Sequence, residues 1–165
     1  MSARSGGLFA GPLAADAGVG ILLEALHFYP GARIDFVRAG TSRIELRRRM
    51  QRCAYLVVPS LSNDAELQAL VMAFAEGLPV IASRLAALAD LVEPGRNGLL
   101  FEPGSARDLA RRLAWAEAFP EKMRQMGECA QADYQARFVA HWDWRRLYGE
   151  RRLKNRERSP VPQIV

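Results

Sequence analysis

The residues that could support chemistry are few, and their spacing fits neither a catalytic cluster nor a metal site. His27 and His141 each lack a nucleophile or an acid nearby in the sequence, so neither indicates a catalytic pair. Cys53 and Cys129 lie far apart without metal-ligand spacing, which predicts two buried or half-buried thiols in a reducing compartment. A helix that begins after Gly18 would offer free N–H groups to an anion. We therefore expect no metal site and no cofactor.

Basic residues gather at the C-terminal end of the chain. The net charge is +5, and residues 145–158 alone carry seven basic and two acidic side chains, so the remainder balances to zero. This end could bind an acidic lipid or a nucleic acid, or it could be a solvated helix face followed by a tail. Few aromatic residues interleave with these charges and no nucleic-acid motif is present, so a nucleic-acid partner is not expected. A second arginine cluster over 43–52 is offset by acids elsewhere.

Length and composition are those of one globular domain. With 165 residues, half of them hydrophobic, the chain can bury a core without metal or disulfide support. No apolar run approaches the ~20 residues that a membrane span needs. The first seven residues lack the apolar stretch of a signal peptide. We expect a cytoplasmic protein with a single domain over residues 1–153 and a basic polar tail over 154–165.

Short apolar runs alternate with helical periods, which predicts βα units and a parallel sheet. Five strands are expected, at 7–11, 33–39, 54–58, 79–82 and 99–101. Helices are expected over 19–29, from Ser42, from Asp64 to Glu76, over 86–91, from Ser105 and over 123–136. The helix that begins at Ser42 has a capping box, which Glu45 completes. A final helix is expected to carry the apolar cluster of Trp142, Trp144, Leu147 and Tyr148. The fold class predicted is α/β, with a doubly wound, Rossmann-like parallel sheet.

Two segments carry a specific pattern. Residues 59–83 begin with Pro-Ser, continue through a polar loop and a helix, and end in Ala-Phe-Ala-Glu-Gly-Leu-Pro-Val-Ile-Ala-Ser. Residues 91–100 read Leu-Val-Glu-Pro-Gly-Arg-Asn-Gly-Leu-Leu. Both resemble the donor-binding core of glycosyltransferase family 4, and the resemblance extends over about residues 7–148. It implies the C-terminal domain of a two-domain (GT-B) glycosyltransferase, whose chemistry is hexosyl transfer from a nucleotide diphosphate-sugar donor.

The resemblance also implies where a nucleotide-sugar would bind. The matching positions are Gly11, Gly18, Ser60, Asp64 and Asp90. Asp64 falls where the family has a Glu beside the transferred sugar, so it is the one catalytic candidate. It is equally placed to cap the helix that follows.

Several positions depart from the family pattern. The Arg and Lys that neutralise the donor diphosphate in the family are Pro12 and Ala17 here, and neither makes a charge-assisted contact. The Glu that holds the ribose hydroxyls is Met72, which fits core packing better. The Gly-rich approach to the phosphates is replaced at 65–67 by Ala, Glu and Leu.

The resemblance leaves parts of the family enzyme without a counterpart. Only residues 30–32 separate the first helix from the second strand, where the family has a further βα unit. The N-terminal acceptor domain is also unmatched. A second chain could supply the acceptor side, or the domain could form a homo-oligomer through the aromatic cluster of Trp142, Trp144, Leu147 and Tyr148.

Three functions follow from these features. The first is a glycosyltransferase-like domain that is not catalytic on its own. The second is a non-catalytic scaffold or partner subunit whose core follows the family while its ligand positions do not. The third is an anionic-surface binder acting through the basic C-terminal helix.

Overall fold

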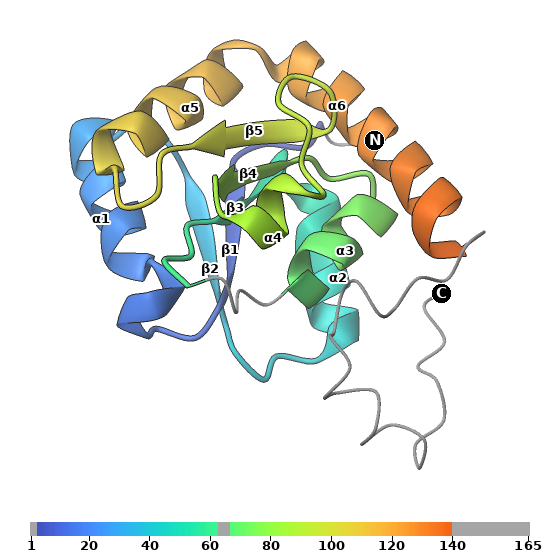
Figure 1. Cartoon of the computed structure of the whole chain (residues 1–165), viewed down its shortest axis with the longest axis horizontal. Helices are drawn as coiled ribbons and strands as arrows, with labels where there is room; N and C mark the ends of the chain where they lie inside the picture. The colour runs from blue at the N-terminus through green and yellow to red at the C-terminus, as the bar shows by residue number, and fades with distance from the viewer. Residues whose placement is uncertain (1–2, 63–66, 140–165) are drawn as a thin grey trace.

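A computed structural model describes residues 3–62 and 67–139 of the chain, which form a parallel sheet flanked by helices (Figure 1). Several predicted features lie outside these residues. They are Asp64, Glu66, His141, the aromatic cluster of Trp142, Trp144, Leu147 and Tyr148, the basic end at 145–158 and the tail at 154–165.

The sheet has five strands, all parallel, in the order β2-β1-β3-β4-β5. They are β1 (Gly7–Gly11), β2 (Ile34–Arg38), β3 (Tyr55–Val58), β4 (Val80–Ser83) and β5 (Gly98–Phe101). The central strands β3 and β4 are almost wholly buried, as their unbroken apolar sequences predict. The predicted five-stranded parallel sheet is confirmed.

The helices follow the predicted order with some shifted ends. They are α1 (Val19–Phe28), α2 (Arg43–Arg52), α3 (described over Leu67–Ala75), α4 (Ala86–Ala89), α5 (Ala106–Ala118) and α6 (Pro120–Tyr134). A 3-10 turn, Ala15–Ala17, lies in the predicted first loop, and a π-helical turn, Gln135–Val139, follows α6. Helix α6 begins at Pro120 and not at residue 123, because proline needs no hydrogen-bond partner in a first turn. Within the described residues, no helix is both long and apolar enough to cross a bilayer.

Two predicted caps are present. The hydroxyl of Ser42 accepts a hydrogen bond from the Glu45 N–H at 3.2 Å, and Ser105 caps α5 through the Asp108 N–H at the same distance. The Glu45 carboxylate accepts from Arg49 Nε at 3.0 Å instead of turning back to Ser42. One of the two hydrogen bonds of the expected capping box is therefore formed, and the Glu45 carboxylate forms an ion pair with Arg49 in place of the other.

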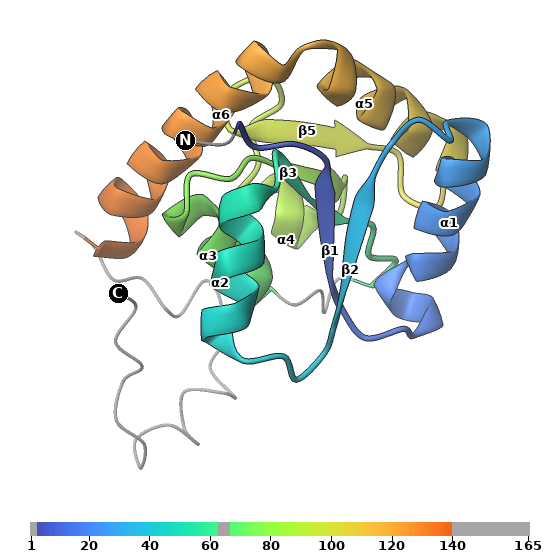
Figure 2. The same ribbon diagram turned by 180° about the vertical axis from the view of Figure 1, so that it is seen from behind.

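Helices cover both faces of the sheet (Figures 1 and 2). One core contains Leu22 of α1 and Leu109 of α5, and the other contains Met50 of α2 and Phe74 of α3. Helix α6 contributes to both cores, through its first half to one and its second half to the other. This arrangement confirms the doubly wound sheet.

The turn before β5 is fixed by a buried polar side chain. Asn97 is 1% exposed; its side-chain oxygen accepts from the Glu93 N–H at 2.7 Å, and its amide donates to Asp133 of α6 at 2.8 Å. Arg96 forms two hydrogen bonds to the same carboxylate, at 2.6 and 2.7 Å. Burial raises the pKa of Asp133, but these hydrogen bonds and the Arg96 charge outweigh it and hold that pKa below its usual value. The Arg-Asn-Gly segment therefore joins the turn to α6 and is structural.

Candidate functional site

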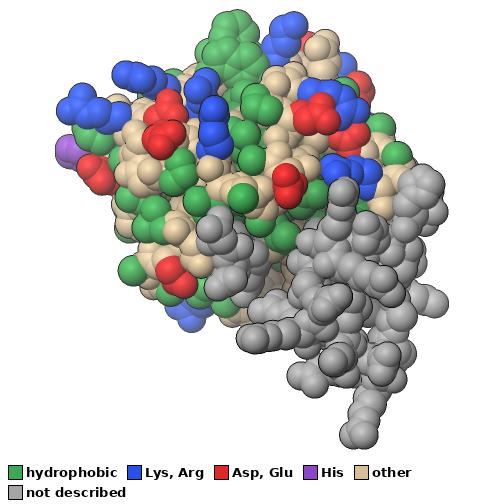
Figure 3. Space-filling view, in the orientation of Figure 1, with side chains coloured by type: hydrophobic (Ala, Val, Ile, Leu, Met, Phe, Trp, Pro, Cys, Tyr) green, Lys and Arg blue, Asp and Glu red, His purple; other side chains and the backbone are tan. Residues whose placement is uncertain are grey.

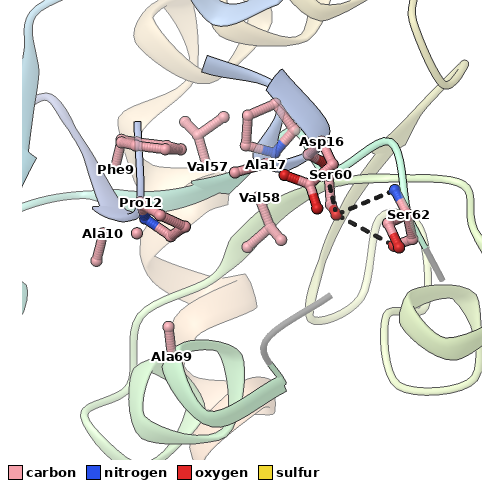
Figure 4. Close-up of a pocket in the computed structure, with 12 residues that line it drawn as sticks. Phe9, Ala10, Pro12, Asp16, Ala17, Val57, Val58, Ser60, Ser62 and Ala69 are labelled. Atoms are coloured by element: carbon pink, nitrogen blue, oxygen red, sulfur yellow. Dashed lines mark hydrogen bonds between the residues drawn. The ribbon is translucent and has the colours of Figure 1, made fainter. Parts of the chain in front are cut away.

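The strand order places a crevice between β1 and β3. From β1 the chain crosses to β2 on one side, whereas β3, β4 and β5 follow on the other. The loops after β1 and β3 therefore diverge at the carboxyl edge of the sheet, which is where ligands bind in open α/β sheets. A pocket of about 150 Å³ lies at this point, lined by residues 9–12, 16–17, 57–60, 62 and 69 (Figure 4).

The two loops that form the pocket are held against each other. Gly18 has a φ of +80°, and a Cβ atom there would lie 1.7 Å from the Pro59 carbonyl oxygen. The Leu61 N–H donates to the Asp16 carbonyl oxygen at 2.8 Å. The Ser60 hydroxyl lies 3.1 Å from the Ser62 carbonyl oxygen and 3.5 Å from that of Asp16. These contacts fix the shape of the pocket without a ligand.

The structure brings together some of the residues proposed from the sequence. Gly11 and Ser60 line the pocket, and Gly18 lies directly behind it against Pro59. Asp90 is exposed at the end of α4 and is not among the lining residues; its carbonyl oxygen accepts from Arg137 at 3.5 Å. Asp64 lies outside the described residues.

The described lining of the pocket contains no basic residue. Pro12 and Ala17, the positions matched to the cations of the family, both belong to the wall. Asp16 is the one ionisable residue of the described lining, and it is exposed. Figure 4 shows Asp16 with Ser60 and Ser62 on one side of the pocket and apolar residues on the other. A negative charge and apolar walls do not favour a diphosphate.

Sequence reasoning passed over Asp16. The sequence places Asp16 in the loop after the first strand. That this loop lies next to the loop after β3 follows from the strand order, which was not predicted from the sequence. The volume is also below the roughly 300–1,000 Å³ of pockets that enclose a whole organic ligand. The described walls therefore enclose a small space lined by two serines, Ser60 and Ser62, and by Asp16.

Other candidate residues take structural roles. Met72 is half-buried and packs against the core beneath α3, as expected from its side chain. His27 is exposed on α1. Burial, with a smaller effect of the nearby Asp35 carboxylate, raises the pKa of the Cys53 thiol to about 11, and Cys129 is half-buried. In the part of the chain that the structure describes, no group of acidic, His and Cys side chains could hold a metal ion.

Comparison with known proteins gives one family. The family model described as Glycosyl transferases group 1 matches residues 23–117. The uncharacterized glycosyltransferase MJ1178 of Methanocaldococcus jannaschii is 31% identical over 144 residues, an alignment that covers 74% of this chain and 41% of that protein. The chain thus spans about two fifths of the length of this curated relative.

Solved structures share the fold. The C-terminal domain of a glycosyl transferase group 1 family protein (LpcC) from Francisella tularensis superposes with a TM-score of 0.67 at 16% identity, covering 82% of this chain and 88% of that domain. Anabaena Alr3699/HepE, solved in complex with UDP-glucose, superposes with a TM-score of 0.71 at 22% identity, covering 81% of this chain and 45% of that protein. The predicted GT-B C-terminal fold is confirmed.

Proposed function

The chain belongs to the glycosyl transferases group 1 family, and from this premise we propose that its domain descends from a donor-binding half, is not catalytic on its own and serves as a partner domain. The fold needed for sugar transfer is kept. The described lining of the pocket offers no basic side chain to hold a nucleotide diphosphate-sugar. The domain then contributes its folded surface to a complex or to a longer enzyme.

The observation that carries this proposal is the wall of the pocket between β1 and β3. A donor diphosphate carries about two negative charges, and arginine or lysine side chains make the strong contacts to it. Pro12 and Ala17, which the resemblance matches to those side chains, belong to the wall, and Asp16 adds a negative charge beside them. A helix N-terminus at Gly18 contributes only partial charges. The electrostatic balance therefore opposes diphosphate binding.

The acceptor side must come from elsewhere if the domain takes part in sugar transfer. Relatives such as MJ1178 are more than twice as long as the segment matched here. We propose that a second chain or a further segment supplies the acceptor-binding half. The Anabaena protein binds UDP-glucose, so a nucleotide diphosphate-sugar is the ligand class to test.

The test is thermal unfolding of the purified chain with UDP, GDP, ADP and their sugar conjugates. We expect no shift in Tm at millimolar ligand. The variant Pro12→Arg/Ala17→Lys should regain a shift with at least one of them, because a ligand at about 100 times its Kd adds roughly 2.7 kcal/mol to stability.

The matched control adds the same two charges outside the pocket. Leu13→Arg/Leu23→Lys changes two exposed apolar side chains, 72% and 55% accessible, and should gain no ligand response. A clear shift of the parent chain with any nucleotide diphosphate would refute the proposal. An equal response from the two double variants would show that net charge, and not the pocket, governs binding.

A further inference from the structure

Helix α2 presents an arginine-rich face to solvent. Arg43, Arg47, Arg48 and Arg52 are exposed, and Gln51 is exposed among them. At 100° per residue these positions occupy one half of the helix, while Leu46 and Met50 of the other half pack into the core. Figure 2 shows α2 on the outside of the molecule, beside β1. The face is therefore open to a partner.

The acids near α2 neutralise only part of this face. Asp35 and Glu45 both pair with Arg49, at 2.7 and 3.0 Å, at the solvent-exposed flank of the helix. Glu76 of the α3 end pairs with Arg47 at 2.5 Å. Within the described residues no ion pair is formed by Arg43, Arg48 or Arg52, so their charges stay available.

The opposite side of the molecule differs from this pattern. In Figure 3 basic and acidic side chains lie among one another over the visible face. Along α6, Arg124 pairs with Glu121 and Glu128, and on α5 Arg112 lies 3.9 Å from Asp108. What distinguishes α2 is that three arginines without an ion pair in the described residues, Arg43, Arg48 and Arg52, lie on one face of a single helix.

An apolar side chain lies within the arginine face. Ile44 is 68% exposed, and its position on the helical wheel falls between Arg47 and Arg48. Arginine heads around an exposed aliphatic side chain suit an anionic bilayer, where phosphates take the charges and the apolar group enters the acyl boundary. A nucleic acid would instead favour aromatic side chains for stacking, and this face has none.

We propose that the outer face of α2 is a docking surface for a membrane rich in anionic lipid, with Arg43, Arg48 and Arg52 binding headgroups and Ile44 entering the interface. The surface is independent of the pocket between β1 and β3. Docking through this surface would not require a membrane-spanning helix.

The experiment measures partitioning of the full chain onto vesicles by cosedimentation. Vesicles of phosphatidylcholine with added phosphatidylserine should bind the protein, and pure phosphatidylcholine vesicles should not. An arginine at an anionic surface contributes about fivefold to partitioning, or about 1 kcal/mol. Arg48→Gln/Arg52→Gln should therefore weaken binding by about 30-fold.

The matched control removes two exposed charges elsewhere. Arg111→Gln/Lys122→Gln makes the same change in net charge on α5 and α6 and should alter partitioning by less than about fivefold. All variants keep the C-terminal arginines at 145–158, so a difference between the double variants belongs to α2. Ile44→Gln should weaken vesicle binding without changing its salt dependence.

Three results would overturn the proposal. One is no binding of the parent chain to anionic vesicles, and another is parental binding by Arg48→Gln/Arg52→Gln. The third is tighter binding to a DNA or RNA duplex than to vesicles with no effect of Ile44→Gln, which would assign the face to nucleic acid. Circular dichroism of each variant checks that the fold is intact.

Discussion

Gly18 joins the two halves of the pocket, and replacing it with alanine should damage the fold at that point. The residue ends the 3-10 turn and begins α1 in the left-handed region, at a φ of +80°. A new Cβ would lie 1.7 Å from the Pro59 carbonyl oxygen, which is a backbone atom and cannot rotate away. Gly18→Ala must therefore either separate the two loops or change the start of α1.

The expected loss combines two costs. A non-glycine residue in the left-handed region costs about 1–2 kcal/mol, and overpacking against a fixed group costs about 1–3 kcal/mol. Together they predict a loss of about 2–5 kcal/mol, which for a domain of this size lowers Tm by about 4–20 °C.

Gly20→Ala is the internal control. Gly20 lies two residues further along, within α1, and a methyl group there would meet no neighbouring segment within 4 Å. Alanine at this position should add about 0.5–1 kcal/mol, because glycine loses more conformational freedom in a helix. Urea and thermal unfolding followed by circular dichroism would compare both variants with the parent chain. Unchanged or increased stability of Gly18→Ala would refute the proposed contact with Pro59.

Three further predictions concern single side chains. The pKa of Asp133 is held below its usual value, so the ionised carboxylate stabilises the fold above about pH 4, and this stabilisation is lost as pH falls through the lowered pKa. Asp133→Asn should remove this contribution to the pH dependence of the free energy of unfolding, as measured by urea titration at several pH values. In a Cys129→Ala variant, the buried Cys53 should react with a thiol reagent at about pH 8 only after unfolding, since burial raises its pKa to about 11; rapid native labelling would contradict this. Tyr55→Phe should cost about 0.5–1.5 kcal/mol, because the hydroxyl donates to Glu117 at 2.8 Å; an unaltered urea midpoint would show that this bond contributes nothing.

The local elements were largely predictable from the sequence. The apolar runs of β3 and β4 have no competing helical period, and the Ser42 and Ser105 caps depend on residues three positions apart. Such features need only neighbouring residues. The start of α6 was wrong by three residues because Pro120 reads as a breaker unless its position in a first turn is recognised.

The candidate site was only partly predictable. The resemblance identified Gly11, Ser60 and Gly18, which the structure gathers at one edge of the sheet. It did not identify Asp16, whose side chain became relevant only when the β1 and β3 loops were seen to meet. Whether Asp90 or Asp64 contributes to ligand binding stays a prediction.

The sequence by itself determined the order of strands and helices, the family pattern and the presence of Pro12 and Ala17 at positions that the resemblance matches to cations, because these are properties of residue type and spacing. Tertiary structure decided three other matters: that β1 and β3 are neighbours, that Gly18 contacts Pro59, and that Asp35 and Glu45 near α2 both pair with Arg49. Each of these depends on contacts between distant segments, and strand order and helix packing set those contacts. Charge pairing in particular depends on distance in space. The acidic and basic residues outside the C-terminal end balance in number, and yet one face of α2 is positive.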